Sequence, residues 1–255
     1  MNYPKSQQYT DLDMVYTECS GPGGLQLAEY IADKMGMVAN EYLLDIGMNR
    51  GLQTCFLAKE YGVKAIGIDP WDDRKSGKPH IEHMLDNAHR LDIAGNVLGQ
   101  KIGVPDTNFA DNSFRVIYST TTFEMIRGMS GYDAYLKALR EVYRILQPGG
   151  IFGYGEPIHL DYQLSEDQAA MVKGVWGNCF GTLEETLQAF QEVGFRIRES
   201  GVPDDAGAWW TEYAQHDPFC RQQPQTDEAK AIAALNDTWL SFGFIIAMKP
   251  GIATY

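Results

Sequence analysis

The chain has 255 residues, 44% of them hydrophobic and 22% charged, which is ordinary for one large α/β domain with a full core. Its formal net charge of -13 and its pI near 4.7 argue against nucleic acid and against an anionic membrane surface, because both partners require a basic patch. The four cysteines are scattered, so neither a structural zinc site nor a disulfide framework is expected. The first residues lack the apolar core of a signal peptide, and no apolar run reaches membrane-spanning length. We therefore expect a cytoplasmic protein.

The N-terminal part divides into a polar stretch and a helix. Residues 1–20 are mostly polar, and we expect them to be loosely ordered. Apolar residues then recur at helical spacing from Leu25 to Met35, and Gly36 follows where a helix C-cap is expected. Two interpretations of this helix stay open: it covers a ligand pocket, or it only packs against the core.

The next segment is typical of a strand, a glycine turn and a helix. Residues 42–46 suit a buried parallel strand, Gly47 and Gly51 bracket a tight turn, and apolar residues at helical spacing follow. This arrangement forms a site for a nucleotide-like ligand at the carboxyl end of a strand. A dinucleotide site needs a glycine near the position of Asn49 and no acid before the first glycine. Asp45 precedes that glycine; a carboxylate there repels pyrophosphate and suits the ammonium of a bound amino acid.

A second buried strand over residues 63–69 ends in Asp69, at the distance from the first acid that one βαβ unit requires. A carboxylate at this strand tip can accept hydrogen bonds from ribose hydroxyls. Trp71 follows; it either packs on an adenine face or is an ordinary core or surface tryptophan.

The alternation of strands and helices continues to the end of the chain. Thr182 and Glu185 form a capping-box pattern, and Gly194 closes the helix that they start. Strands are expected at 97–102 and 115–119, after the Pro-Gly-Gly turn at 148–150, and at 195–199 and 240–249, and helices at 81–91 and 132–146.

Three blocks of this sequence resemble class I S-adenosylmethionine-dependent methyltransferases, in particular the small-molecule family of the ubiquinone/menaquinone-biosynthesis type (type 11). They are Asp45–Gly51, which looks like motif I, the segment 108–117 with its Asp-Asn-Ser-Phe, and the segment 143–157 with its Gln-Pro-Gly-Gly. The resemblance covers about residues 22–249. It implies an α/β, doubly wound (Rossmann-like) sheet of seven mostly parallel strands, with helices on both faces. The last strand would run antiparallel between the fifth and the sixth.

The resemblance also implies roles in binding S-adenosylmethionine. Gly103 stands where the family has an adenine-contacting acid, so the backbone N–H of Val104 would serve adenine instead. In the first turn, the methionyl end would be held by Asp45, Gly47, Asn49 and Gly51. Asp69 at the second strand tip would hold the ribose, and Trp71 and Val104 would hold adenine. The sulfonium would lie over Ser119.

Methyl transfer is an in-line displacement, so positioning carries most of the catalysis, and a base is needed only where the acceptor must first lose a proton. Glu124 falls near the reaction centre by resemblance, and His159 follows the fifth strand. Both are candidate catalytic residues, and His216 is a third candidate base. For each histidine, the alternative is a hydrogen-bonded surface group.

The chain organisation follows from the same resemblance. Residues 1–40 would form an N-terminal cap, 41–156 the cofactor-binding core, and 157–181 and 201–237 insertions that form the substrate pocket and lid. The insertions hold aromatic residues that would line a cage for an ammonium group or would simply pack as a lid. These substrate-binding candidates are Trp176, Trp209, Trp210, Tyr213 and His216.

The sequence thus predicts an S-adenosylmethionine-dependent methyltransferase of a small molecule, with an amine or hydroxyl favoured, without a metal and compatible with a homodimer. Three alternatives stay open. The segment 176–181 resembles the metalloid-binding cysteine segment of arsenite methyltransferases, so Cys179 with Cys55 and Cys220 would serve thiol or metalloid methylation. The departures at Asn49 and Gly103 would suit a non-catalytic S-adenosylmethionine-binding protein. A nicotinamide-dependent oxidoreductase is disfavoured by the first turn.

Overall fold

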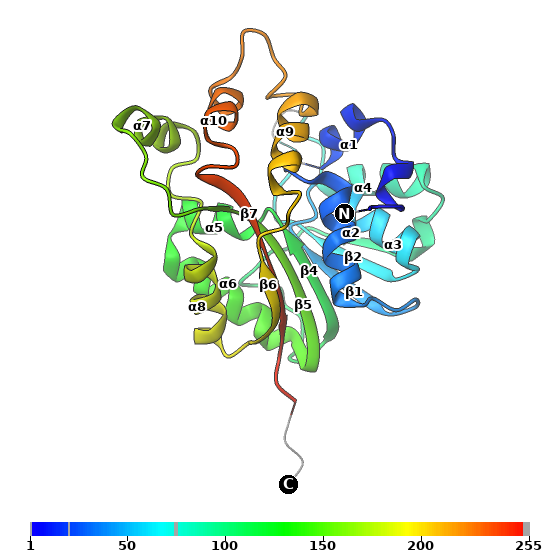
Figure 1. The fold of residues 1–255 in the computed structure, drawn as a ribbon. Helices are drawn as coiled ribbons and strands as arrows, with labels where there is room; N and C mark the ends of the chain where they lie inside the picture. The colour runs from blue at the N-terminus through cyan, green and yellow to red at the C-terminus, as the bar shows by residue number, and fades with distance from the viewer. Residues whose placement is uncertain (1, 20, 74–75, 252–255) are drawn as a thin grey trace.

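The computed structural model describes residues 2–19, 21–73 and 76–251. Its strands form a single sheet (Figure 1). They are β1 (Tyr42–Ile46), β2 (Lys64–Ile68), β3 (Val97–Gln100), β4 (Phe114–Thr120), β5 (Leu146–His159), β6 (Arg196–Gly201) and β7 (Leu240–Met248). The order across the sheet is β3-β2-β1-β4-β5-β7-β6, and β7 runs antiparallel to both of its neighbours. The predicted doubly wound sheet, with the last strand inserted antiparallel, is confirmed.

Helices cover both faces of the sheet (Figure 1). They are α1 (Leu12–Glu18), α2 (Gly24–Met35), α3 (Leu52–Tyr61), α4 (His80–Arg90), α5 (Phe123–Ser130), α6 (Tyr132–Ile145), α7 (Glu166–Val175), α8 (Leu183–Val193), α9 (Ala206–His216) and α10 (Asp227–Leu235). Because strand side chains alternate, Leu43 packs with α2 and α3 on one face, and Leu44 packs with α6 and α8 on the other. The inner strands β1, β4, β5 and β7 are therefore largely buried on both sides, as their apolar runs predict, whereas the edge strands β3 and β6 are half-buried or exposed.

The predicted helix ends are also observed. Gly36 ends α2 and Gly194 ends α8, both in the left-handed conformation, and Thr182 and Glu185 make both hydrogen bonds of the capping box. No helix among the described residues is both long enough and apolar enough to span a membrane.

The expectation of a loose N-terminal stretch is wrong over its described residues. The Tyr3 hydroxyl donates to Asp205 at 2.6 Å, and the Tyr16 hydroxyl donates to Glu212 at 2.8 Å. Both tyrosine side chains are buried, and Glu29 accepts the backbone N–H of Ser6 at 2.7 Å. The sequence could not indicate this order, because the partners of the two tyrosines lie about 200 residues further along the chain.

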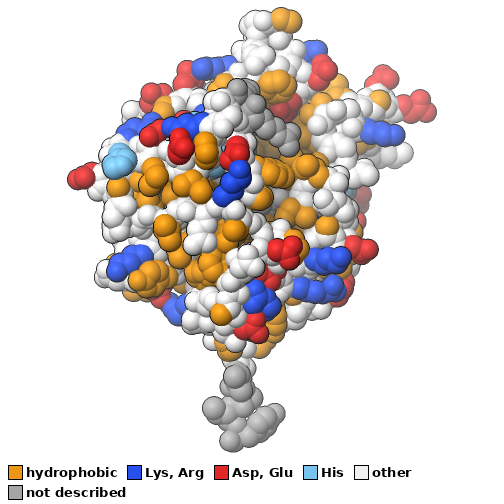
Figure 2. Space-filling view, turned by 180° about the vertical axis from the view of Figure 1, so that it is seen from behind, with side chains coloured by type: hydrophobic (Ala, Val, Ile, Leu, Met, Phe, Trp, Pro, Cys, Tyr) orange, Lys and Arg blue, Asp and Glu red, His pale blue; other side chains and the backbone are white. Residues whose placement is uncertain are grey.

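The two long insertions form helices beyond the carboxyl edge of the sheet (Figure 1). The first contains α7, and the second contains α9 and α10. Parts of all three helices pack into a separate apolar cluster whose largest members are Trp176, Trp210 and Trp239. Seen from behind, hydrophobic side chains gather across the middle of the molecule, with charged side chains between and around them (Figure 2).

Candidate functional site

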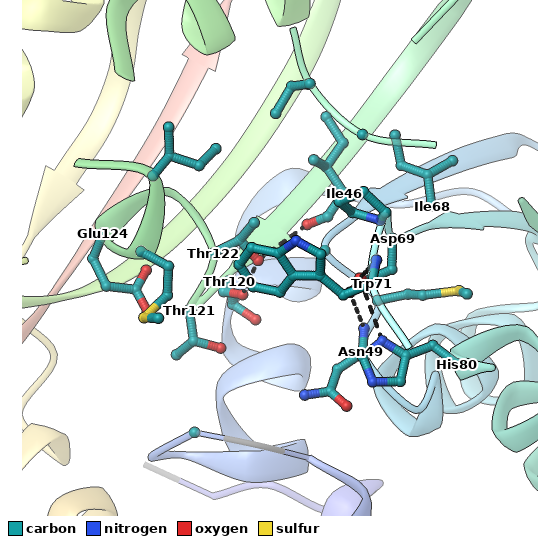
Figure 3. A pocket seen from close by; sticks show the side chains of 18 of the residues that line it. Ile46, Asn49, Ile68, Asp69, Trp71, His80, Thr120, Thr121, Thr122 and Glu124 are labelled. Carbon is teal, nitrogen blue, oxygen red and sulfur yellow. Dashed lines mark hydrogen bonds and ion pairs between the residues drawn. The ribbon is translucent and has the colours of Figure 1, made fainter. Parts of the chain in front are cut away.

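A cavity of about 560 Å³ lies at the carboxyl ends of β1, β2 and β4, where the last residues Ile46, Ile68 and Thr120 contribute to its wall. Its volume is in the range of small-molecule sites, and its place is where ligands bind in open α/β sheets. Figure 3 shows lining residues from these strand ends and the turns after them, together with His80 of α4 and Glu124 of α5.

The turn after β1 passes very close to the loop after β4. Gly47 has a φ of 81°, and a Cβ atom there would lie 2.0 Å from Oγ1 of Thr122. Asn49 also has a positive φ, of 48°, which asparagine adopts more readily than most residues. Asn49 therefore has a backbone conformation that the usual glycine of motif I could also adopt at this position. Gly47 and Asn49 both line the cavity, whereas Gly51 lies behind it as the N-cap of α3.

Asp69 connects two turns of the cavity wall. One carboxylate oxygen accepts the backbone N–H of Asn49 at 3.0 Å, and the other accepts that of Trp71 at 2.9 Å. The residue lines the cavity although it is only 6% exposed. Because a carboxylate has about four acceptor positions, Asp69 can still accept hydrogen bonds from a ligand.

The apolar side chains of Ile68, Trp71 and Val104 also line the cavity. Gly103 precedes Val104, and a Cβ atom there would lie 2.9 Å from Cγ of Pro70. An acid at this position would therefore need Pro70 to move.

Asp45 does not line the cavity, contrary to the expectation that it holds a ligand ammonium. It is buried and accepts a hydrogen bond from the hydroxyl of Thr54 in α3. Burial raises the pKa of Asp45 to about 7. Ser119 is buried as well and donates to the carbonyl of Ile46 at 2.7 Å, so it supports the turn from behind rather than facing a ligand.

The opposite wall comes from the β4–α5 loop and α5. Glu124 lines the cavity, and its Oε2 atom is buried without a hydrogen-bond partner among the described residues. Met125 and Met129 continue this wall toward the surface, where they are 36% and 57% exposed. The wall therefore combines one buried carboxylate with a flexible apolar strip.

Glu156 holds this loop in place from inside the sheet, although sequence reasoning did not single it out. Its carboxyl group accepts the backbone N–H groups of Thr122, Phe123 and Glu124 at 2.9–3.3 Å. These are N–H groups at the start of α5, which have no partner within the helix. Burial raises the pKa of Glu156 to about 8, although the backbone hydrogen bonds act in the opposite direction.

The N-terminal segment also contributes to the cavity, which the sequence did not indicate. Glu18 and Cys19 line it from the end of α1. One oxygen of Glu18 lies 3.4 Å from the guanidinium of Arg50, and the other accepts from the buried side chain of Asn87 at 2.9 Å. Both contacts are long-range and leave no periodic signal in the sequence.

The aromatic residues of the insertions do not line this cavity, so the predicted cage is not formed there. Trp209 and Trp210 are buried, and their indole N–H groups donate to the side chain of Gln26 and to the Ser241 carbonyl, both at 3.1 Å. The remaining candidates, Trp176, Tyr213 and His216, contact the apolar cluster of the insertions or α1. These three side chains are half-buried and lie outside the cavity wall.

His159 is separated from Glu124. It lines a second hollow of about 420 Å³ and stacks on Trp239, with ring centroids 5.2 Å apart. Its Nδ1 atom lies 3.2 Å from the Leu160 carbonyl oxygen. The two predicted catalytic residues therefore do not share one site.

The cysteines do not converge either. Cys19 lines the cavity, Cys179 packs beside Gly128 in α5, and Cys220 belongs to the apolar cluster of the insertions. Burial raises the pKa of all these thiols, and that of Cys55 to about 12. Within the described ranges, no group of three or more His, Cys, Asp or Glu side chains has metal-binding geometry. Nothing in this arrangement favours reactive thiolates.

The comparisons with known proteins agree with this geometry. A family model described as a methyltransferase domain matches residues 44–153. A sterol 24-C-methyltransferase from Yarrowia lipolytica is 24% identical over 223 residues, which is 82% of this chain and 51% of that protein. The chain spans about half the length of the curated relatives it matches.

Two solved structures share the fold. The [4+2]-cyclase SpnF has a TM-score of 0.74 at 16% identity and covers 98% of this chain and 94% of its own. The geranyl diphosphate C-methyltransferase from Streptomyces coelicolor A3(2), solved with Mg²⁺, geranyl-S-thiolodiphosphate and S-adenosyl-L-homocysteine, has a TM-score of 0.69 at 16% identity. It covers 89% of this chain and 76% of its own. Identities this low speak to the fold alone.

Proposed function

Because this chain belongs to the class I S-adenosylmethionine-dependent methyltransferases, we propose that it transfers a methyl group from S-adenosylmethionine to a small molecule, at an amine or a hydroxyl. The observation that carries the proposal is the cavity, which combines the Gly47–Asn49 turn, the Asp69 carboxylate and the buried Glu124 oxygen. The turn follows β1, Asp69 follows β2, and Glu124 lies in α5 after β4, and all of them line one cavity. Asn49, Asp69 and Glu124 are labelled in Figure 3.

The residues of the cavity fit the parts of this cofactor. The turn after β1 would hold the methionyl end, Asp69 would accept the ribose hydroxyls, and the part of the cavity lined by Trp71 and Val104 would take adenine. Two buried polar atoms without a hydrogen-bond partner among the described residues, on His80 and Glu124, belong to cavity-lining residues, as a polar ligand requires.

S-adenosylmethionine supplies an electrophilic methyl group, and the residues of this chain would orient the acceptor and accept its proton. Glu124 would hold a hydroxyl or amine through its unpartnered oxygen and act as the base where the acceptor must lose a proton. Met125 and Met129 would cover the apolar part of the acceptor and exclude water. We favour an acceptor that carries an apolar body next to its reacting polar atom.

Replacing Asp69 with asparagine is expected to weaken the binding of S-adenosylhomocysteine at least about tenfold, because one charged acceptor of the ribose becomes a donor. Calorimetric titration measures this change. Replacing the exposed Asp92, which lies outside the cavity, with asparagine is the control. Unchanged affinity in the Asp69 variant would contradict the ribose role.

Replacing Glu124 with glutamine is expected to lower kcat/KM for a hydroxyl acceptor about a hundredfold, the lower end of the contribution of a general base. The affinity for S-adenosylhomocysteine should change little. His159→Gln should leave kcat/KM within about twofold, since His159 lines the second hollow. A large loss in the His159 variant with none in the Glu124 variant would reverse these assignments.

The first experiment is calorimetric titration with S-adenosylmethionine, S-adenosylhomocysteine and NAD. Micromolar binding of the first two without NAD supports the proposal and justifies a screen of amines, phenols and aliphatic alcohols as acceptors. Binding of S-adenosylmethionine with turnover on no acceptor would support the alternative of a non-catalytic binding protein. The cysteines are separated, and burial raises the pKa of the Cys55 thiol, so they give no support to thiol or metalloid methylation.

Further proposals concern location and assembly. Four free cysteines support a cytoplasmic location. The net charge of -13 supports the proposal that the protein binds neither nucleic acid nor membranes. A homodimer and the division into cap, core and lid stay proposals, which cell fractionation, light scattering and limited proteolysis would test.

A further inference from the structure

The imidazole of His80 has a nitrogen atom, Nδ1, that lacks a hydrogen-bond partner among the described residues. His80 is the first residue of α4, it lines the cavity, and it is 8% exposed. The Nδ1 atom itself is buried. Because a buried polar atom without a partner destabilises a protein, such an atom in a cavity wall indicates a ligand that supplies the bond.

The position of His80 relative to Asp69 identifies the part of the ligand concerned. Nδ1 lies 3.3 Å from one carboxylate oxygen of Asp69, a contact marked in Figure 3, but the imidazole is not aligned for a hydrogen bond. The Asp69 oxygens instead accept the backbone N–H groups of Asn49 and Trp71. An unpartnered imidazole nitrogen thus lies beside the carboxylate that would bind the ribose.

We propose that His80 is a second ribose-binding residue and that it makes the site selective for a nucleoside with both ribose hydroxyls. This inference rests on the proposed function, because it requires an adenosyl ligand in the cavity. A vicinal diol offers two donors and several acceptor positions. Asp69 accepts the hydroxyl protons with its remaining lone pairs, and Nδ1 of His80 bonds the nearer hydroxyl oxygen or its proton, according to the tautomer.

The test is equilibrium binding of three probes: S-adenosylhomocysteine and its 2′-deoxy and 3′-deoxy analogues. Wild-type protein and His80→Phe, which keeps a ring but removes both nitrogens, are compared by calorimetry. We expect His80→Phe to bind S-adenosylhomocysteine about tenfold more weakly, the size of one hydrogen bond to a buried group. Wild-type protein should bind S-adenosylhomocysteine more tightly than its deoxy analogues. For one of the two analogues, this ratio of affinities should be about tenfold smaller in His80→Phe.

Two further variants separate binding from structure. His80→Asn, whose side-chain amide can reach the position of Nδ1, should restore most of the affinity and the discrimination. His83→Phe lies one turn further along α4, where its imidazole faces Asp73 at 3.7 Å outside the cavity wall, and it should change neither quantity. Thermal unfolding of each variant shows that the folded protein is being compared.

The outcomes distinguish the two proposals. If His80→Phe weakened all three probes equally and kept the wild-type discrimination, or if His80→Asn rescued nothing, His80 would only support the structure and the inference would be overturned. If the wild-type protein bound none of the probes, both the proposed function and the inference about His80 would fail.

Discussion

Gly47→Ala is expected to reduce the affinity for S-adenosylhomocysteine more than about a hundredfold and the free energy of unfolding by about 3 kcal/mol. The added Cβ would lie 2.0 Å from Oγ1, 2.5 Å from Cγ2 and 2.8 Å from Cβ of Thr122. Rotation of the threonine removes only part of this overlap, since its Cβ is itself too close. The two loops, which both line the cavity, must therefore move apart.

The same substitution at Gly36 provides a matched control. Gly36 also has a left-handed φ, of 66°, but its added Cβ would meet nothing within 4 Å, and it lies at the end of α2 outside the cavity wall. Gly36→Ala should therefore destabilise the protein by only about 1 kcal/mol, the cost of the strained backbone, and leave binding unchanged. Chemical denaturation and calorimetry measure both variants. Equal effects at the two positions would show that backbone strain, not the Thr122 contact, makes Gly47 necessary.

The sequence predicted the part of the site that depends on local pattern. Apolar runs ending in Asp45 and Asp69 mark two parallel strands, and the carboxyl ends of such strands meet at one edge of the sheet. The turn at Gly47 and Asn49 and the acid Asp69 were therefore found from spacing, and they line the cavity. Val104, which also lines it, was found only through the family resemblance. Which side of a strand a residue faces is harder to predict where both faces are buried. Asp45 was consequently assigned to the ligand, although it faces Thr54.

The residues that the sequence missed are held by contacts between distant segments. Glu18 reaches the cavity because α1 lies on the turn after β1, and Glu156 acts through backbone groups of another loop. Composition likewise cannot distinguish an aromatic cage from a small apolar core. The sequence pattern of Trp209 and Trp210 fits either role. Their hydrogen bonds to Gln26 and Ser241 show that they belong to the core.

Glu156→Ala is expected to lower the free energy of unfolding by about 3 kcal/mol or more, because three backbone N–H groups at the start of α5 lose their acceptor. The loop that carries Glu124 should loosen at the same time. Glu156→Gln keeps one acceptor oxygen and should be affected less. Urea unfolding monitored by tryptophan fluorescence measures the stability of both variants. An alanine variant as stable as wild type would show that the hydrogen bonds to Glu156 do not stabilise the start of α5.

The pH dependence of stability gives an independent test of the same group. Burial raises the pKa of Glu156 to about 8 and that of Asp45 to about 7. At pH values between these raised pKa values and the usual carboxyl range, the folded protein therefore binds protons that the unfolded chain has lost. Stability should therefore rise as the pH falls, by about 2 kcal/mol from pH 8 to pH 6.5 for the two carboxyls together.

Single variants divide this pH effect between the two carboxyl groups. Glu156→Gln should remove the larger part of the rise, because the pKa of Glu156 lies nearer the upper end of the range, and Asp45→Asn should remove the rest. Below about pH 6.5 the lowered pKa of His83 acts in the opposite direction, since the unfolded chain then binds the additional proton. A wild-type stability that stayed flat from pH 8 to pH 6.5 would mean that both carboxyl groups are more hydrated than their burial implies, and that the loop carrying Glu124 opens to water.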